Sequence, residues 1–275
     1  MLNLLVAAAI AAATPGGIPV PPPSPVSLPT DPAMFVVRDS DTTIYIFGTF
    51  HALDAKTEWF KDSVRKAFES SDELVLETLV PEGPEKPGLP AIAPTPAKFQ
   101  TLSVAPSASF LATARLAINA GRAQGMQVGN GADAVLRQLA EQEGKQVEGL
   151  ETLQLQLDMF NRMPAPPQGA TSSGAPLSKA ADINVLTRSM AEMQAAWKRG
   201  DQSVFVRLLD QLNQASPDTY RMMFTERNAR WADWIKARMQ TPGIVFVAVG
   251  AGHLAGKDSV LVRLAELGVP SQRVY

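Results

Sequence analysis

Two histidines, His51 and His253, are the residues in this chain best suited to chemistry, and each closes a Gly-x-x-His turn after an apolar, strand-like run. Glycine makes up 19 of 275 residues, so a histidine has glycine three places before it in roughly 7% of random cases. A single histidine in such a turn is more often a core or capping residue. Because the motif occurs twice, we expect both imidazoles to have a functional role.

Two glutamates occupy similar places along the chain. Glu77 ends the strand-like run 73–77, and Glu151 follows the run 146–150, each within Leu-Glu-Thr. A carboxylate at the end of a buried strand needs a partner, because burying it unpaired is costly. An arginine salt bridge or a helix N-terminus would satisfy either one. With two histidines expected at neighbouring strand ends, the pattern favours a His/Glu cluster.

A cluster of this kind suits a divalent metal ion. Two histidines and one glutamate, with water in the open position, form one recognised catalytic zinc site, and the same donors bind manganese, cobalt or iron. The metal would polarise a carbonyl and lower the pKa of its water, and the remaining glutamate could accept the water proton. Cysteine is absent, which excludes thiolate ligands, thiolate nucleophiles and disulfides.

Arg227 and Asn228 interrupt an apolar stripe on the helix expected from Asp218. An arginine in such a stripe must meet a carboxylate, a carbonyl or a ligand. It would either bridge to Glu77 or Glu151, or bind a substrate carboxylate or an oxyanion, and the sequence leaves both open. The apolar positions of this stripe are Tyr220, Met223, Phe224, Trp231, Trp234 and Ile235.

The elements that must position these residues repeat at the two ends of the chain. Residues 43–47 lead into Gly48–His51 and residues 244–249 into Gly250–His253, and a helix and a strand are expected after each. Near-continuous apolar runs are typical of strands buried on both faces. We predict an α/β (or α+β) fold in which a central mixed sheet, with two strand–GxxH–helix–strand units, is flanked by helices. Further strands are expected at 34–37, 73–77, 146–150 and 272–274, and helices at 54–70 (capped by Asp54), 108–124, 132–144, 179–199, 202–214, 218–240 and 258–267.

The domain organisation follows from proline and from the N-terminus. Eight of the 22 prolines lie between residues 15 and 32, six between 81 and 96, and four between 164 and 176. Residues 1–13 resemble a secretory signal peptide, although no basic residue precedes the apolar run. We expect a signal at 1–13, a linker at 14–33 and one domain at 34–275, with insertions near 81–106 and 164–178 that connect elements or act as a binding lid. The protein would then be periplasmic or secreted.

Composition excludes several partners. A formal net charge of −2 gives no support to a nucleic-acid partner, and after the signal no segment is long and apolar enough for a membrane span. His-Glu-x-x-His and Gly-x-Ser-x-Gly are absent, and Asp258 stands where a phosphate loop needs Ser or Thr. A peptide or small-molecule substrate is the partner that we expect, and the oligomeric state is open.

Taken together, the motifs resemble the TraB/PrgY/GumN family, which also includes the Tiki metalloproteases. The resemblance implies an α/β or α+β fold around a central sheet and a metal-dependent hydrolase, since Tiki proteins cleave peptides with Gly-x-x-His histidines and glutamate. Related folds include a haem-binding lipoprotein and erythromycin esterases. The GumN-like bacterial branch, to which we assign the chain, typically carries an export signal. The motifs are Phe47–His51, Leu76–Thr78, Gly149–Thr152 with Gln154, Arg227–Asn228 with Trp231, and Val249–Leu254.

We therefore expect an exported metal-dependent hydrolase, a peptidase, that uses manganese, cobalt or zinc. His51, His253 and Glu77 would bind the metal. Glu151 would act as the base or as an acid behind a metal ligand, and Arg227 and Asn228 would hold substrate or an oxyanion. The alternative is a non-catalytic protein that binds metal, haem or a peptide at the same place, and a scaffold in polysaccharide production is suggested by the GumN name alone.

Overall fold

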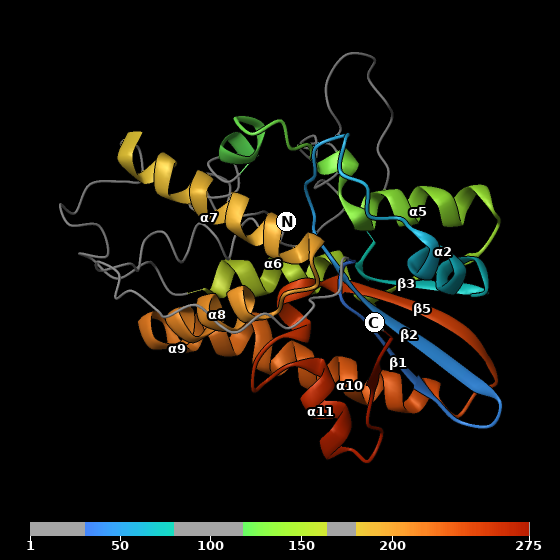
Figure 1. Ribbon diagram of the computed structural model, residues 1–275. Coiled ribbons are helices and arrows are strands. Elements are labelled where there is room, and N and C mark those ends of the chain that lie inside the picture. Colours follow the sequence, from blue (N-terminus) through green and yellow to red (C-terminus); the bar gives the residue numbers. More distant parts are fainter. Residues whose placement is uncertain (1–30, 80–117, 164–179, 275) are drawn as a thin grey trace, which may run out of the picture.

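The computed structural model describes residues 31–79, 118–163 and 180–274, and a six-stranded sheet lies at its centre (Figure 1). The strand order is β4-β3-β5-β2-β1-β6. The neighbours β4, β3, β5 and β2 run parallel, whereas β1 is antiparallel to both β2 and β6. The predicted mixed sheet is therefore confirmed. The strands are β1 (Met34–Arg38), β2 (Thr42–Thr49), β3 (Glu73–Thr78), β4 (Gln146–Glu151), β5 (Gly243–Gly250) and β6 (Gln272–Arg273).

The two strands that precede the Gly-x-x-His turns are direct neighbours in the sheet. β2 and β5 pair in parallel from Thr42 with Gly243 to Thr49 with Gly250. Along β5, Phe246 points to one hydrophobic cluster and Val245 and Val247 to another. Because side chains alternate between the faces of a strand, a sheet covered on both sides needs apolar residues at every position. This explains the near-continuous apolar runs in the sequence.

Helices cover both faces of the sheet (Figure 1). One face packs against α10 (Glu226–Arg238) and α11 (Val260–Glu266), with Trp231, Ile235 and Leu264 buried there. The other face carries the larger cluster, formed with α2 (Asp62–Glu69), α5 (Ala132–Gln142), α7 (Ala180–Lys198) and α8 (Ser203–Ala215). The remaining elements are the short helix η1 (Val128–Asn130), α6 (Leu153–Arg162), α9 (Pro217–Tyr220), the π-helical η2 (Arg221–Thr225) and η3 (Ala251–Leu254).

Three local expectations differ from the structure. The helix expected from Asp54 begins at Asp62 instead, because the Asp54 carboxylate accepts hydrogen bonds from the Lys56 N–H at 2.8 Å and the Thr57 hydroxyl at 2.6 Å and forms a turn. The helix expected over 218–240 starts as α9 and is widened into a π-helical turn, η2, just before Arg227. Such turns often occur at functional sites. The helix α6 was not expected.

Several expectations lie outside the described residues. These are the signal at 1–13, most of the linker at 14–33, both proline-rich insertions and the first part of the helix expected over 108–124. Within the described ranges, no helix combines the length and apolar character needed to cross a bilayer.

Candidate functional site

The polar residues singled out in the sequence come together at the carboxyl ends of the parallel strands. His51 follows β2, Glu77 lies near the end of β3, Glu151 ends β4, and His253 lies in η3 directly after β5. Parallel strands end at the same edge of a sheet, so residues distant in sequence meet there. Arg227 reaches the same place from α10. All five side chains are buried.

Arg227 lies at the centre of the cluster and is fully buried. Its Nη2 is 3.0 Å from Glu77 Oε2 and 2.8 Å from Glu151 Oε2, and its Nε donates to Glu151 at 2.9 Å. Its Nη1 lies 3.3 Å from His253 Nε2 and 3.5 Å from the Met223 carbonyl oxygen. Burial alone would lower the pKa of Arg227, but the charges of Glu77 and Glu151 outweigh it and raise the pKa. Of the two alternatives left open by the sequence, the bridge to the glutamates is the one present.

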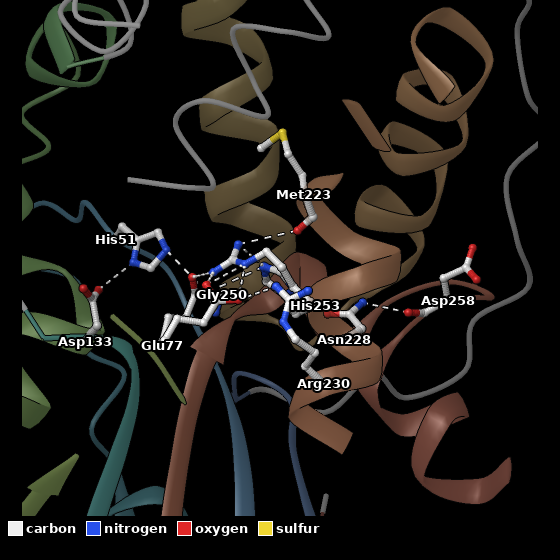
Figure 2. Close-up of polar contacts among 11 residues, drawn as sticks. His51, Glu77, Asp133, Met223, Asn228, Arg230, Gly250, His253 and Asp258 are labelled. Atoms are coloured by element: carbon white, nitrogen blue, oxygen red, sulfur yellow. Dashed lines mark hydrogen bonds and ion pairs between the residues drawn. The ribbon is translucent and has the colours of Figure 1, made fainter. Parts of the chain in front are cut away.

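The hydrogen-bond pattern assigns the protonation state of His253. The Asn228 Nδ2 donates to the Asp258 carbonyl at 2.7 Å, which directs Asn228 Oδ1 toward His253 Nδ1 at 2.5 Å (Figure 2). An amide oxygen only accepts, so Nδ1 carries the hydrogen and Nε2 keeps its lone pair toward Arg227. Burial lowers the pKa of His253 to about 3; Arg227 acts in the same direction and Glu77 against it. The ring is therefore neutral near neutral pH.

Glu77 lies between the two imidazoles. Its Oε1 accepts a hydrogen bond from the Gly250 N–H at 2.6 Å and lies 3.9 Å from His51 Nε2 and 3.8 Å from His253 Nε2. Burial would raise the pKa of Glu77, but the charge of Arg227 and the hydrogen bond from the Gly250 N–H hold it well below the ordinary value. Glu77 is therefore a carboxylate at neutral pH, with both oxygens engaged.

His51 contacts a residue that the sequence did not single out. Its Nδ1 lies 2.9 Å from Oδ1 of Asp133, in the first turn of α5 (Figure 2). Burial would raise the pKa of Asp133, but interactions with His51 lower it. Acidic residues are common in first helical turns because of the helix dipole, so the type and place of Asp133 drew no attention. The available signal was Gly131, two residues before Asp133, because glycine permits a close backbone approach.

His51, His253 and Glu77 are the donors expected for a metal ion. Nε2 of His51 is a buried atom without a hydrogen bond in the described part of the chain, and each imidazole has an oxygen facing its Nδ1, as metal-binding histidines commonly do. The chemistry of the set thus fits a divalent cation. The separations of 3.8 and 3.9 Å are not those of a closed coordination sphere, however, and no three His, Asp or Glu side chains in the described residues form a ready metal-binding group. Arg227 supplies the positive charge in this arrangement.

Comparison with known proteins identifies the family. The TraB/PrgY/gumN family model matches residues 33–91 and 92–273, which include every residue of the cluster. The chain therefore belongs to the TraB/PrgY/gumN family, as its motifs indicated. No curated protein and no solved structure matches the chain. Assignment to the GumN-like branch stays a prediction.

Proposed function

We propose that the chain is an exported hydrolase that uses a divalent metal ion, manganese, cobalt or zinc, to cleave peptides. The observation that carries this proposal is that Nε2 of His51 and Nε2 of His253 both face Oε1 of Glu77, at 3.9 and 3.8 Å. Two imidazoles and one carboxylate form a recognised catalytic donor set. The apolar N-terminal run and the absence of cysteine support export to the periplasm or beyond.

The residues of the chain would have separate tasks. A bound ion supplies a Lewis acid and a water of lowered pKa. Glu77 contributes a negative charge to attract the cation, and Asn228 holds the His253 ring so that its Nε2 lone pair points into the cluster. For a cation to engage His253, Arg227 Nη1 must give up its 3.3 Å contact with that nitrogen.

Glu151 and Arg227 restrain each other in the present arrangement. Glu151 accepts hydrogen bonds from Arg227 and from Arg230, the latter at 3.1 Å. The N–H groups of Arg227 point to Glu77, Glu151, His253 and a carbonyl oxygen. We therefore propose that release of this pair by a cation or substrate frees Glu151 to act as base and Arg227 to bind an oxyanion.

The second candidate is a non-catalytic protein that binds metal, haem or a peptide with the same residues. Arg227 favours this candidate, because its guanidinium already compensates the buried carboxylates and contacts the His253 lone pair. Because the Arg227 guanidinium balances the buried carboxylates, the cluster is stable without a metal ion, and its burial does not imply a catalytic role.

The metal content and the peptidase activity of the purified full chain distinguish the metal-dependent hydrolase from the non-catalytic binding protein. We expect about one ion per chain in the wild type, loss of that ion in His51→Ala, His253→Ala and Glu77→Gln, and peptide-library cleavage that depends on added manganese, cobalt or zinc. Glu73→Gln is the matched control, because Glu73 is also a buried glutamate on β3 but pairs with Arg238 at 3.0 Å. Unchanged metal content in both histidine variants, or no ion in the wild type, would refute the metal site. A bound ion without cleavage supports the binding protein, and a Soret band with haem identifies its ligand.

A further inference from the structure

We infer that Asp133 is the positioning residue of His51: its carboxylate accepts the hydrogen of Nδ1 and thereby leaves Nε2 as a lone pair directed at Glu77. This inference deepens the proposed function and rests on it, because a lone pair at Nε2 matters only if a ligand or proton is to be received there. Asp133 lies 82 positions beyond His51 in the sequence, and neither the two histidine motifs nor the match to the family model singles it out.

The contact between the two side chains is close and has no competitor among the described residues. His51 Nδ1 and Asp133 Oδ1 are 2.9 Å apart, and neither atom has a well-aligned hydrogen bond in the described part of the chain. The His51 side chain is 7% exposed, whereas that of Asp133 is 32% exposed, so water reaches part of the carboxylate but little of the ring. A carboxylate only accepts, so the imidazole must donate from Nδ1. Catalytic hydrogen bonds are often poorly aligned until a ligand binds. This explains why Nδ1 and Oδ1 are close together although the N–H does not point directly at the oxygen.

Backbone contacts hold the start of α5 against the His51 turn. The Ala132 N–H donates to the Phe50 carbonyl oxygen at 3.0 Å. A Cβ built on Gly131 would lie 2.4 Å from the His51 carbonyl oxygen, so a residue other than glycine would push the two segments apart. The separation between Asp133 and His51 is thus set by the backbone of both segments.

The same arrangement occurs at the second histidine with a different chemistry. Each ring has a side-chain oxygen from another element at its Nδ1, Asp133 Oδ1 for His51 and Asn228 Oδ1 for His253 (Figure 2). A carboxylate behind an imidazole increases the electron density at Nε2, whereas a neutral amide orients the ring without adding charge. His51 Nε2 is therefore a stronger electron-pair donor than His253 Nε2, because Asp133 carries a negative charge and Asn228 does not.

Nuclear magnetic resonance of the metal-free full chain tests this directly, because the two histidines give two sets of imidazole nitrogen signals. With ¹⁵N-labelled histidine at mildly alkaline pH, we expect both wild-type rings to carry hydrogen on Nδ1. Asp133→Ala should move His51 toward the Nε2–H form and leave His253 unchanged, whereas Asp133→Asn, which keeps an acceptor oxygen, should restore much of the wild-type pattern. Asp62→Ala is the matched control, because Asp62 occupies the first turn of α2. An Nε2–H form of His51 in the wild type, or no change in Asp133→Ala, overturns the inference.

Metal affinity then separates this inference from the proposed function. If the wild type binds zinc, Asp133→Ala should weaken binding by about 10- to 100-fold, while Asp62→Ala binds like the wild type. Equal affinities of wild type and Asp133→Ala overturn the positioning role at the metal. If the wild type binds no zinc, manganese or cobalt, the proposed function fails, and the tautomer of His51 still decides whether Asp133 positions the ring.

Discussion

Replacing Arg227 with methionine tests whether one central charge holds the buried cluster together. Methionine retains an apolar stem in contact with Trp231, whose ring lies 4.5 Å from the Arg227 guanidinium carbon. The substitution therefore removes mainly the charge and the N–H donors. Glu77 and Glu151 are then left buried. Of the hydrogen bonds described above, Glu77 keeps the one from the Gly250 N–H, and Glu151 keeps the one from Arg230.

The expected loss of unfolding free energy is about 4 kcal/mol, since breaking a buried ion pair typically costs 3–5 kcal/mol. Glu77 accounts for most of it, because Glu151 keeps its 3.1 Å contact with Arg230. With a total stability of about 5–15 kcal/mol, the variant should still fold. Its urea midpoint should fall by more than about 1 M.

Two further variants make the test specific. Arg230→Met removes a half-exposed arginine from the same glutamate and should cost less than about 1 kcal/mol. Adding Glu77→Gln and Glu151→Gln to Arg227→Met should recover a large part of the loss, because neutral amides tolerate burial better than carboxylates. Equal losses for the two arginine variants, or no recovery in the triple variant, would refute the reasoning.

Three other outcomes follow from the structure and can be measured by urea unfolding of metal-free protein. The folded-state pKa of His253, about 3, lies below its ordinary value of 6.5, so between these pH values the unfolded chain binds a proton that the folded chain excludes. Stability should therefore fall as the pH decreases from 6.5 to about 3, by at most about 1.4 kcal/mol per pH unit, and His253→Gln should flatten that slope. Trp197→Phe removes an indole N–H that donates to a buried carbonyl oxygen at 2.6 Å and should cost about 1–2 kcal/mol, and a change near zero would contradict that role. Gly131→Ala brings a Cβ within 2.4 Å of the His51 carbonyl oxygen and should lower the unfolding free energy by about 1–3 kcal/mol. The control Gly129→Ala, whose Cβ meets nothing within 4 Å, should change it by no more than about 0.5 kcal/mol. Equal losses in the two variants would show that the backbones of Gly131 and His51 are not tightly packed.

The central strands were predictable because their burial imposes a pattern on neighbouring residues. β2 and β5 must be apolar at nearly every position when both sheet faces are covered, and a Gly-x-x-His motif begins at the end of each strand. Helix boundaries were less predictable. Asp54 begins a turn in place of a helix because its carboxylate bonds to nearby backbone and hydroxyl groups, a competition that residue type alone does not resolve.

The roles within the site depended on contacts between distant segments. Arg227 was recognisable as a polar residue that needed a partner, but its place between Glu77 and Glu151 follows from how the packing of α10 brings its first turn to these two glutamates. Asp133 looked like an ordinary first-turn acid until the packing of α5 placed it against His51.

The sequence by itself determined that the two histidines and the two glutamates would meet, because strand ends in a parallel sheet share one edge and the motifs mark those ends. Only the tertiary structure decided what they do to one another. It directs the Arg227 guanidinium to two carboxylates and a histidine, sets the hydrogen on His253 through Asn228, and places Asp133 behind His51. These relations depend on distances of about 3 Å between segments far apart in the chain, and no local pattern of residues specifies such distances.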